Sequence, residues 1–102
     1  ASHYSPRGIN GPIDDILYPS KHGMLFSPGY TVLPPMVIYH TSRMNEQKFA
    51  AHCEELAARL DSLWQTDPVA FRQQNAGEYT IPDLTLRPDI APGESGFGVH
   101  VK

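Results

Sequence analysis

The sequence is poor in the features that mark several protein classes. Its 102 residues include a single cysteine, Cys53, which excludes an internal disulfide. No apolar run approaches the roughly 20 residues needed to span a bilayer, and no apolar signal region opens the chain. The net charge is −3 with no long run of one sign, which argues against nucleic-acid binding. These features predict a soluble, cytoplasmic protein with no membrane or nucleic-acid partner.

Metal and nucleophile motifs are also scarce. The five histidines show no metal-ligand spacing, and His52 and Cys53 would face about 100° apart on a helix. No phosphate-binding loop and no serine–histidine or cysteine–histidine pattern is present. We therefore predict no metal site.

What is present is an apolar fraction of 40%, enough for a folded chain, with most proline and glycine near the two ends. Residues 1–12 are broken up by proline and glycine and are predicted to be a loop. Residues 13–27 favour a helix, because acidic residues occupy its first turn. Pro19 should kink that helix or begin a second segment, and Pro28 with the glycine after it should end it.

The pattern over residues 46–65 predicts a long amphipathic helix. Asn45 is a good N-cap, and Met44 and Phe49 stand at the positions of a hydrophobic staple. One face carries apolar residues spaced four, three, four and three apart. We expect this face to pack against a sheet or a second subunit, and its cysteine to be an inert core thiol. The face consists of Phe49, Cys53, Leu56, Leu60 and Leu63.

Residues 30–40 are rich in Val, Ile, Thr and Tyr and predict one strand. The prolines at 34 and 35 suit an edge strand, and the apolar run after them suits a strand covered on both faces. One strand cannot satisfy its own backbone groups. The chain is therefore expected to be a piece of an α/β domain. Its other strands would come from a missing segment or another copy.

Residues 66–102 show no sustained period and are interrupted by proline and glycine. A stretch of this length without regular structure is unusual inside a compact domain. We therefore divide the chain into residues 1–68, part of the α/β domain, and residues 69–102, an irregular tail that wraps over a surface of this subunit or of a partner.

Several motifs occur in order. Residues 4–11 read Tyr-Ser-Pro-Arg-Gly-Ile-Asn-Gly, residues 16–19 read Ile-Leu-Tyr-Pro, and residues 29–33 read Gly-Tyr-Thr-Val-Leu. With residues 60–68, they resemble the flavodoxin-like NAD(P)H:quinone oxidoreductase family. The resemblance implies an α/β fold class, here the C-terminal portion of a flavodoxin-like three-layer fold with a helix, one edge strand, a long helix and an irregular tail.

The same resemblance implies the activity and its partners. The intact protein would transfer a hydride from NAD(P)H through a flavin, FAD or alternatively FMN, to a quinone, and would form a homodimer with its sites at the interface. The phosphate-binding loop and the first four strands of the family would lie upstream of this segment. Alone, the chain would then be inactive and would pair with the missing N-terminal half or with a second subunit.

The resemblance also assigns roles to residues of the first loop. Tyr4 matches a tyrosine beside the flavin, where a hydrogen-bond donor stabilises charge that develops on hydride arrival. Asn10 stands where better-studied members carry histidine, and asparagine donates a hydrogen bond but does not titrate. Gly8 and Gly11 would let the backbone approach the flavin ring. Each of these residues could instead serve only the turn in which it lies.

Phe26, Ser27 and Tyr30 match positions that line the substrate cleft in the family, partly from the opposite subunit. Aromatic walls suit flat quinones because they stack on them. For Phe26, packing within the core is the competing role. The chain as a whole could instead be a truncated, non-catalytic fragment that only self-associates or pairs with a separate N-terminal half. An unrelated binding protein with a docking tail is a third, weaker alternative.

Overall fold

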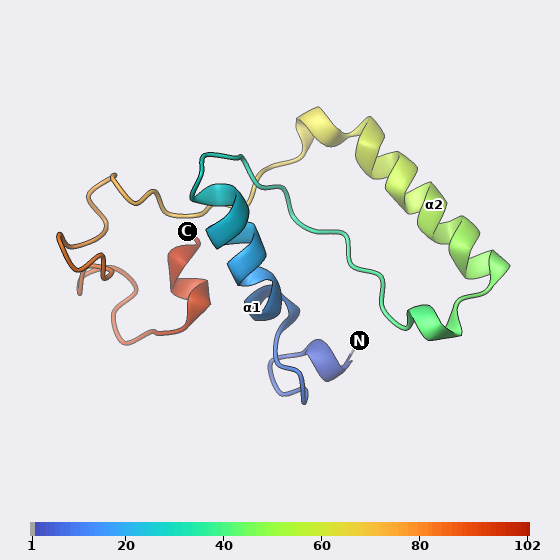
Figure 1. Cartoon of the computed structure of the whole chain (residues 1–102), viewed down its shortest axis with the longest axis horizontal. Helices are drawn as coiled ribbons and strands as arrows, with labels where there is room; N and C mark the ends of the chain where they lie inside the picture. Colours follow the sequence, from blue (N-terminus) through green and yellow to red (C-terminus); the bar gives the residue numbers. More distant parts are fainter. Residues whose placement is uncertain (1) are drawn as a thin grey trace.

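The computed structural model describes residues 2–102 and contains two α-helices joined to shorter helical turns (Figure 1). Helix α1 (Ile13–Tyr18) runs directly into the π-helix η2 (Pro19–Phe26). The change occurs at Pro19, which ends α1 with helical φ and ψ angles of −57° and −37°. Proline has no N–H to donate into the α-helical pattern. The predicted second segment at this position is confirmed.

Helix α2 (Glu46–Asp61) is continued by the 3-10 turn η4 (Leu63–Gln65). The side-chain Oδ1 of Asn45 accepts a hydrogen bond of 2.8 Å from the backbone N of Lys48, so the predicted N-cap is confirmed. Three further 3-10 turns complete the elements: η1 (Ser2–Tyr4), η3 (Thr41–Arg43) and η5 (Phe97–His100).

The predicted edge strand is not confirmed. Residues 30–40 follow an extended path without strand pairing, and the described part of the chain contains only two isolated β-bridges, Phe71 with Val101 and Tyr79 with Leu86. Residues 30–40 are held by a 2.7 Å bond from the N of Val69 to the O of Val32. A strand needs a neighbouring strand as partner, and residues 2–102 supply none for this segment.

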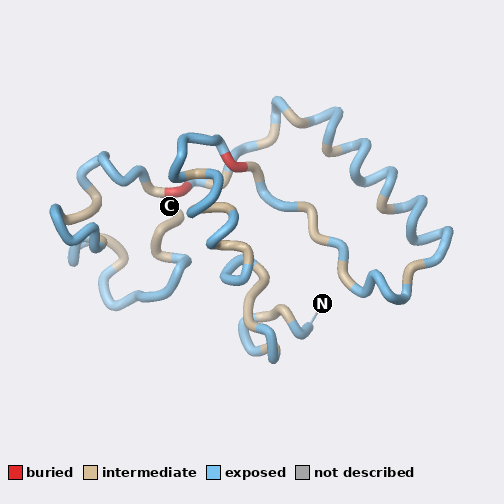
Figure 2. Tube along the Cα trace, in the orientation of Figure 1, coloured by how far each residue is buried: buried red, intermediate tan, exposed pale blue. Residues whose placement is uncertain are grey.

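The core of the described chain is small. Val32 and Phe71 are its buried apolar residues, at 6% and 5% exposure, and they appear as the two red segments in Figure 2. Helix α2 stands apart along the other side of the molecule, and the apolar residues of its face are open to solvent. The prediction that Cys53 is a core thiol is wrong, because Cys53 is exposed. No described element covers the face on which it lies.

Residues 69–102 are mostly irregular and fold back along α1 and η2, so the C-terminus lies beside η2 (Figure 1). The two arms of this segment are joined by backbone bonds from Arg72 N to His100 O, 2.9 Å, and from Lys102 N to Ala70 O, 2.8 Å. An ion pair of 2.8 Å joins Arg72 to Glu78. Within residues 2–102, no helix has the length and apolar character needed to cross a bilayer.

Candidate functional site

The first candidate group lies in the loop before α1. The backbone N of Gly8 donates to Ser5 O at 2.9 Å, and that of Asn10 donates to His3 O at 2.9 Å. These bonds close the loop and bring the predicted residues Tyr4, Gly8, Asn10 and Gly11 into one turn. The Tyr4 ring packs against Tyr39, with ring centroids 5.5 Å apart.

The two glycines of this loop are required for different reasons. A Cβ at Gly8 would collide with backbone atoms of Ser2 and His3, so Gly8 is needed for the loop to close. Gly11 has a φ of +75°, in the left-handed region that favours glycine, and a Cβ there would meet nothing within 4 Å. Gly11 therefore faces open space beside the loop. At position 8, by contrast, glycine is required by the close approach of the backbone of Ser2 and His3, whether or not a ligand binds.

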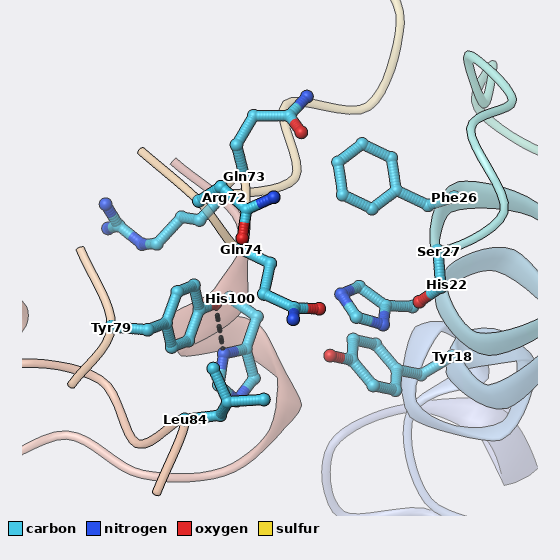
Figure 3. A pocket seen from close by; sticks show the side chains of 11 residues that line it. Tyr18, His22, Phe26, Ser27, Arg72, Gln73, Gln74, Tyr79, Leu84 and His100 are labelled. Atoms are coloured by element: carbon cyan, nitrogen blue, oxygen red, sulfur yellow. Dashed lines mark hydrogen bonds between the residues drawn. The ribbon is translucent and has the colours of Figure 1, made fainter. Parts of the chain in front are cut away.

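The second candidate group lines a cavity of about 420 Å³ between η2 and the tail (Figure 3). Two of the predicted pocket residues, Phe26 and Ser27, lie on its wall. Tyr30 lies instead in an adjoining hollow of about 300 Å³ that shares Phe26. The remaining wall comes from helix and tail side chains that the sequence did not single out, namely Tyr18, His22, Arg72, Gln73, Gln74, Asn75, Tyr79, Leu84 and His100.

Stacked rings build the helix side of the cavity. The Tyr18 ring is stacked on Phe97 at 4.2 Å on one side and on His22 at 4.8 Å on the other. His22 meets Phe71 edge-on at 5.2 Å, and Phe26 lies 5.0 Å from the same ring. The helix places Tyr18 and His22 one turn apart and so on one face. Phe26 thus has the packing role as well as a place on the cavity wall.

The tail builds the opposite side. The Oη of Tyr79 lies 2.7 Å from Nδ1 of His100, and the two rings are stacked at 5.7 Å. Tyr79 precedes His100 by 21 residues, so only the folding of the tail brings them together. This pair and Leu84 face Tyr18, His22 and Phe26 across the cavity in Figure 3.

Burial sets the charge state of the cavity. Burial, and then the neighbouring His100, lowers the pKa of His22, so its neutral form is favoured. Burial, and then Tyr79, raises the pKa of Tyr18, and burial likewise raises that of Tyr79. The hydrogen bond from Arg72 lowers the pKa of Glu78 and keeps that carboxylate ionised. The pKa shifts of Tyr18, Tyr79 and His22 thus all favour the uncharged forms of these three rings.

The structure does not join the two candidate groups. The loop of Tyr4 precedes α1, whereas Ser27 follows the far end of η2. On the helix side, the cavity wall begins at Tyr18, the last residue of α1. No residue of the loop lines the cavity. In the part of the chain that the structure describes, no cluster of metal-ligating side chains occurs.

The chain is similar to several known proteins over most or all of its length. No protein-family model matches it. A ribosyldihydronicotinamide dehydrogenase-like protein of Penicillium crustosum is 45% identical over 98% of this chain, which covers 37% of that protein. An NAD(P)H dehydrogenase [quinone] of Rattus norvegicus is 30% identical over 69% of this chain, or 26% of its own length. A crystal structure of a Klebsiella pneumoniae protein described as a candidate quinone reductase matches 100% of this chain and 39% of its own, with 63% identity and a TM-score of 0.97.

The chain thus spans less than two-fifths of each of these proteins, as expected for one part of a longer fold. The size of the match is consistent with the predicted C-terminal portion. Together, these similarities confirm the family resemblance that the motifs indicated: the chain is a homologue of one segment of the NAD(P)H:quinone oxidoreductases.

Proposed function

We propose that this chain is the C-terminal part of a flavin-dependent NAD(P)H:quinone oxidoreductase, in which a hydride passes from NAD(P)H through the flavin to a quinone. The observation that carries the proposal is the match over the whole chain, at 63% identity and a TM-score of 0.97, to a protein described as a candidate quinone reductase. The flavin would be FAD, with FMN as the other possibility, by family resemblance. A bound flavin supplies the hydride acceptor and donor chemistry.

The loop before α1 supplies the chain's polar groups for this cofactor. Among the described residues, neither the Tyr4 hydroxyl nor the side-chain amide of Asn10 has a hydrogen-bonding partner, so both are available to a bound ring. Tyr4 would donate its hydroxyl proton in a hydrogen bond and so stabilise developing negative charge. Asn10 would donate from a group that does not titrate, so the loop holds a fixed donor rather than a proton relay.

The cavity between η2 and the tail would hold the quinone. Its volume of about 420 Å³ lies within the range of roughly 300–1,000 Å³ typical of small-molecule sites. No residue of the loop lines the cavity, whose wall on the helix side begins at Tyr18, so the loop and the cavity do not share a wall within one copy. We therefore place the complete site between two copies of a homodimer, where the cavity of one copy faces the loop of the other.

The proposal also requires the rest of the fold. The apolar face of α2 and the extended residues 30–40 have no sheet to pack against within residues 2–102. Phe49 and Leu60 are 62% and 60% exposed, which is costly for side chains of this kind. In the longer protein, a parallel sheet would cover them. The chain alone is expected to have no turnover.

A chimera tests the proposal. The matched segment of the Klebsiella pneumoniae protein is replaced by this chain, and oxidation of NADH or NADPH is measured with and without menadione, a naphthoquinone. We expect quinone-dependent turnover and a loss of roughly 10- to 150-fold in kcat for Tyr4→Phe, since one charge-stabilising hydrogen bond contributes about 1.5–3 kcal/mol. The control is Gln47→Leu, which removes a hydrogen-bonding group from an exposed position on α2, outside the loop and the cavity. A folded chimera without turnover refutes the proposal.

The competing function is a non-catalytic fragment that only associates. The exposed apolar face of α2 favours it, because such a face promotes self-association. One experiment distinguishes this function from the enzyme: the chain is mixed with the upstream portion of the Klebsiella pneumoniae protein, expressed as a separate polypeptide. Bound flavin and turnover in the mixture support the enzyme, whereas a stable complex without flavin supports the fragment.

A further inference from the structure

The cavity between η2 and the tail has the shape of a wedge. His100 on the tail wall lies 6.1 Å from Tyr18 and 6.5 Å from His22 on the helix wall, measured between ring centroids. The ring planes are tilted by 39° and 47° in these pairs, so the walls diverge from this point. Aromatic rings attract one another at centroid separations of about 4.5–7 Å. A planar ring entering the mouth of the wedge can therefore contact both walls.

The charged groups at the cavity are already paired with one another. The Arg72 guanidinium donates to a carboxylate oxygen of Glu78 at 2.8 Å and to the backbone O of Val99 at 2.8 Å. Lys102 lies 3.4 Å from the second oxygen of the same carboxylate. Burial lowers the pKa of His22, which keeps that ring neutral. An anionic ring would find no unpaired cation on the cavity wall, so the wedge favours a neutral one.

Several hydrogen-bond donors on the cavity wall have no side-chain partner among residues 2–102, and two of them, Gln74 and His22, lie on opposite walls. The amide of Gln74 projects between the two walls in Figure 3 and makes no hydrogen bond with residues 2–102. The ring nitrogens of His22 also make none in the described chain, although the ring itself is stacked on Tyr18. An amide N–H and an imidazole N–H both donate to carbonyl oxygens. They come from opposite walls and so could bind two carbonyl groups of one flat molecule.

We propose that Gln74 and His22 are specificity-determining residues that select neutral, planar, carbonyl-bearing rings of the naphthoquinone class. The tail then has a defined role as the second wall of the substrate site. This inference rests on the proposed function, because that function makes a quinone the substrate. The inference goes beyond the proposed function because it assigns the selection of the substrate to His22 on the helix wall and Gln74 on the tail wall.

Binding to the full chain tests the inference without any redox reaction. Amide NMR spectra of the nitrogen-labelled chain are titrated with menadione, with methylnaphthalene, which lacks the carbonyls, and with naphthoate, which is an anion. We expect menadione to shift the amides around η2 and residues 72–79 and to bind about tenfold more tightly than either analogue. Gln74→Leu and His22→Phe should each weaken menadione binding about fivefold, the effect of one lost hydrogen bond. Gln47→Leu on exposed α2 is the matched control and should change nothing.

Three results overturn the inference: menadione binds elsewhere or not at all, methylnaphthalene binds as tightly, or naphthoate binds more tightly. If the isolated chain gives no dispersed spectrum, the chimera decides. There, Gln74→Leu must raise KM for menadione about fivefold with kcat unchanged, and an unchanged KM refutes the proposal. If the chimera lacks turnover but the chain binds menadione as expected, the proposed function fails and the binding site stands.

Discussion

The tail should separate from the helices when Phe71 is truncated. Phe71 is 5% exposed and is one of two buried apolar residues in the described chain. Its ring contacts His22 at 5.2 Å and Phe26 at 5.0 Å, so it joins the tail to η2. Phe→Ala substitutions at buried sites cost about 3–5 kcal/mol. Even whole domains have only about 5–15 kcal/mol of stability, so we expect docking of the tail to be lost in Phe71→Ala.

Amide hydrogen exchange measures this effect segment by segment. The amides of Arg72 and Lys102 are bonded to His100 O and Ala70 O when the tail is folded. A loss of about 3 kcal/mol should speed their exchange about a hundredfold or more, because each 1.4 kcal/mol is tenfold. The amides of α2 should be unchanged, since that helix does not contact Phe71.

The same substitution on α2 is the control. Phe49 is 62% exposed in the described chain, so Phe49→Ala should change exchange of the tail amides less than twofold. If Phe71→Ala accelerates the tail amides less than about tenfold, or if the two variants behave alike, then the aromatic cluster does not hold the tail.

Three further predictions concern pH, the helix cap and the loop. Because the folded pKa of His22 is lowered, its stabilising effect is complete above its ordinary value of 6.5 and is lost as pH falls below it. Opening of the tail, measured as amide exchange divided by the intrinsic exchange rate at each pH, should rise between pH 7 and pH 5, and His22→Phe should remove most of that rise. Asn45→Ala should destabilise α2 by about 1 kcal/mol, seen as lower helicity by circular dichroism, whereas Gln47→Ala should leave helicity equal or higher. Gly8→Ala should open the first loop and shift its amide resonances, whereas Gly23→Ala, where a Cβ meets nothing within 4 Å, should not.

The helices could be predicted because their signals are local. The cap at Asn45 and the break at Pro19 depend on residues within one turn of each position, and both are confirmed. The π-helical form of η2 was not predicted, since the sequence shows only that the α pattern must change at a proline.

Features that depend on distant partners were predicted less well. The extended residues 30–40 have strand composition, but pairing needs neighbours that residues 2–102 do not contain. The helical period correctly assigns Cys53 to the apolar face of α2. Periodicity shows which face is apolar but not what covers that face, and Cys53 is exposed in the described chain.

In the candidate site, too, the residues with local sequence signals could be predicted and those that depend on distant partners could not. The residues of the first loop could be named because they form one contiguous motif, and Phe26 and Ser27 do lie on the cavity wall. The tail wall could not be predicted, because Tyr79 and His100 meet only when an irregular segment folds back on itself. For Tyr18 and His22 a signal existed: two aromatic rings four residues apart lie on one helix face.

The most direct test of the enzyme assignment is the visible spectrum of the purified chimera under anaerobic conditions. We predict that it retains flavin through gel filtration, that adding NADH or NADPH bleaches the flavin absorbance, and that menadione then restores it. A folded chimera that carries no flavin, or whose flavin absorbance does not respond to either nicotinamide, would contradict the account.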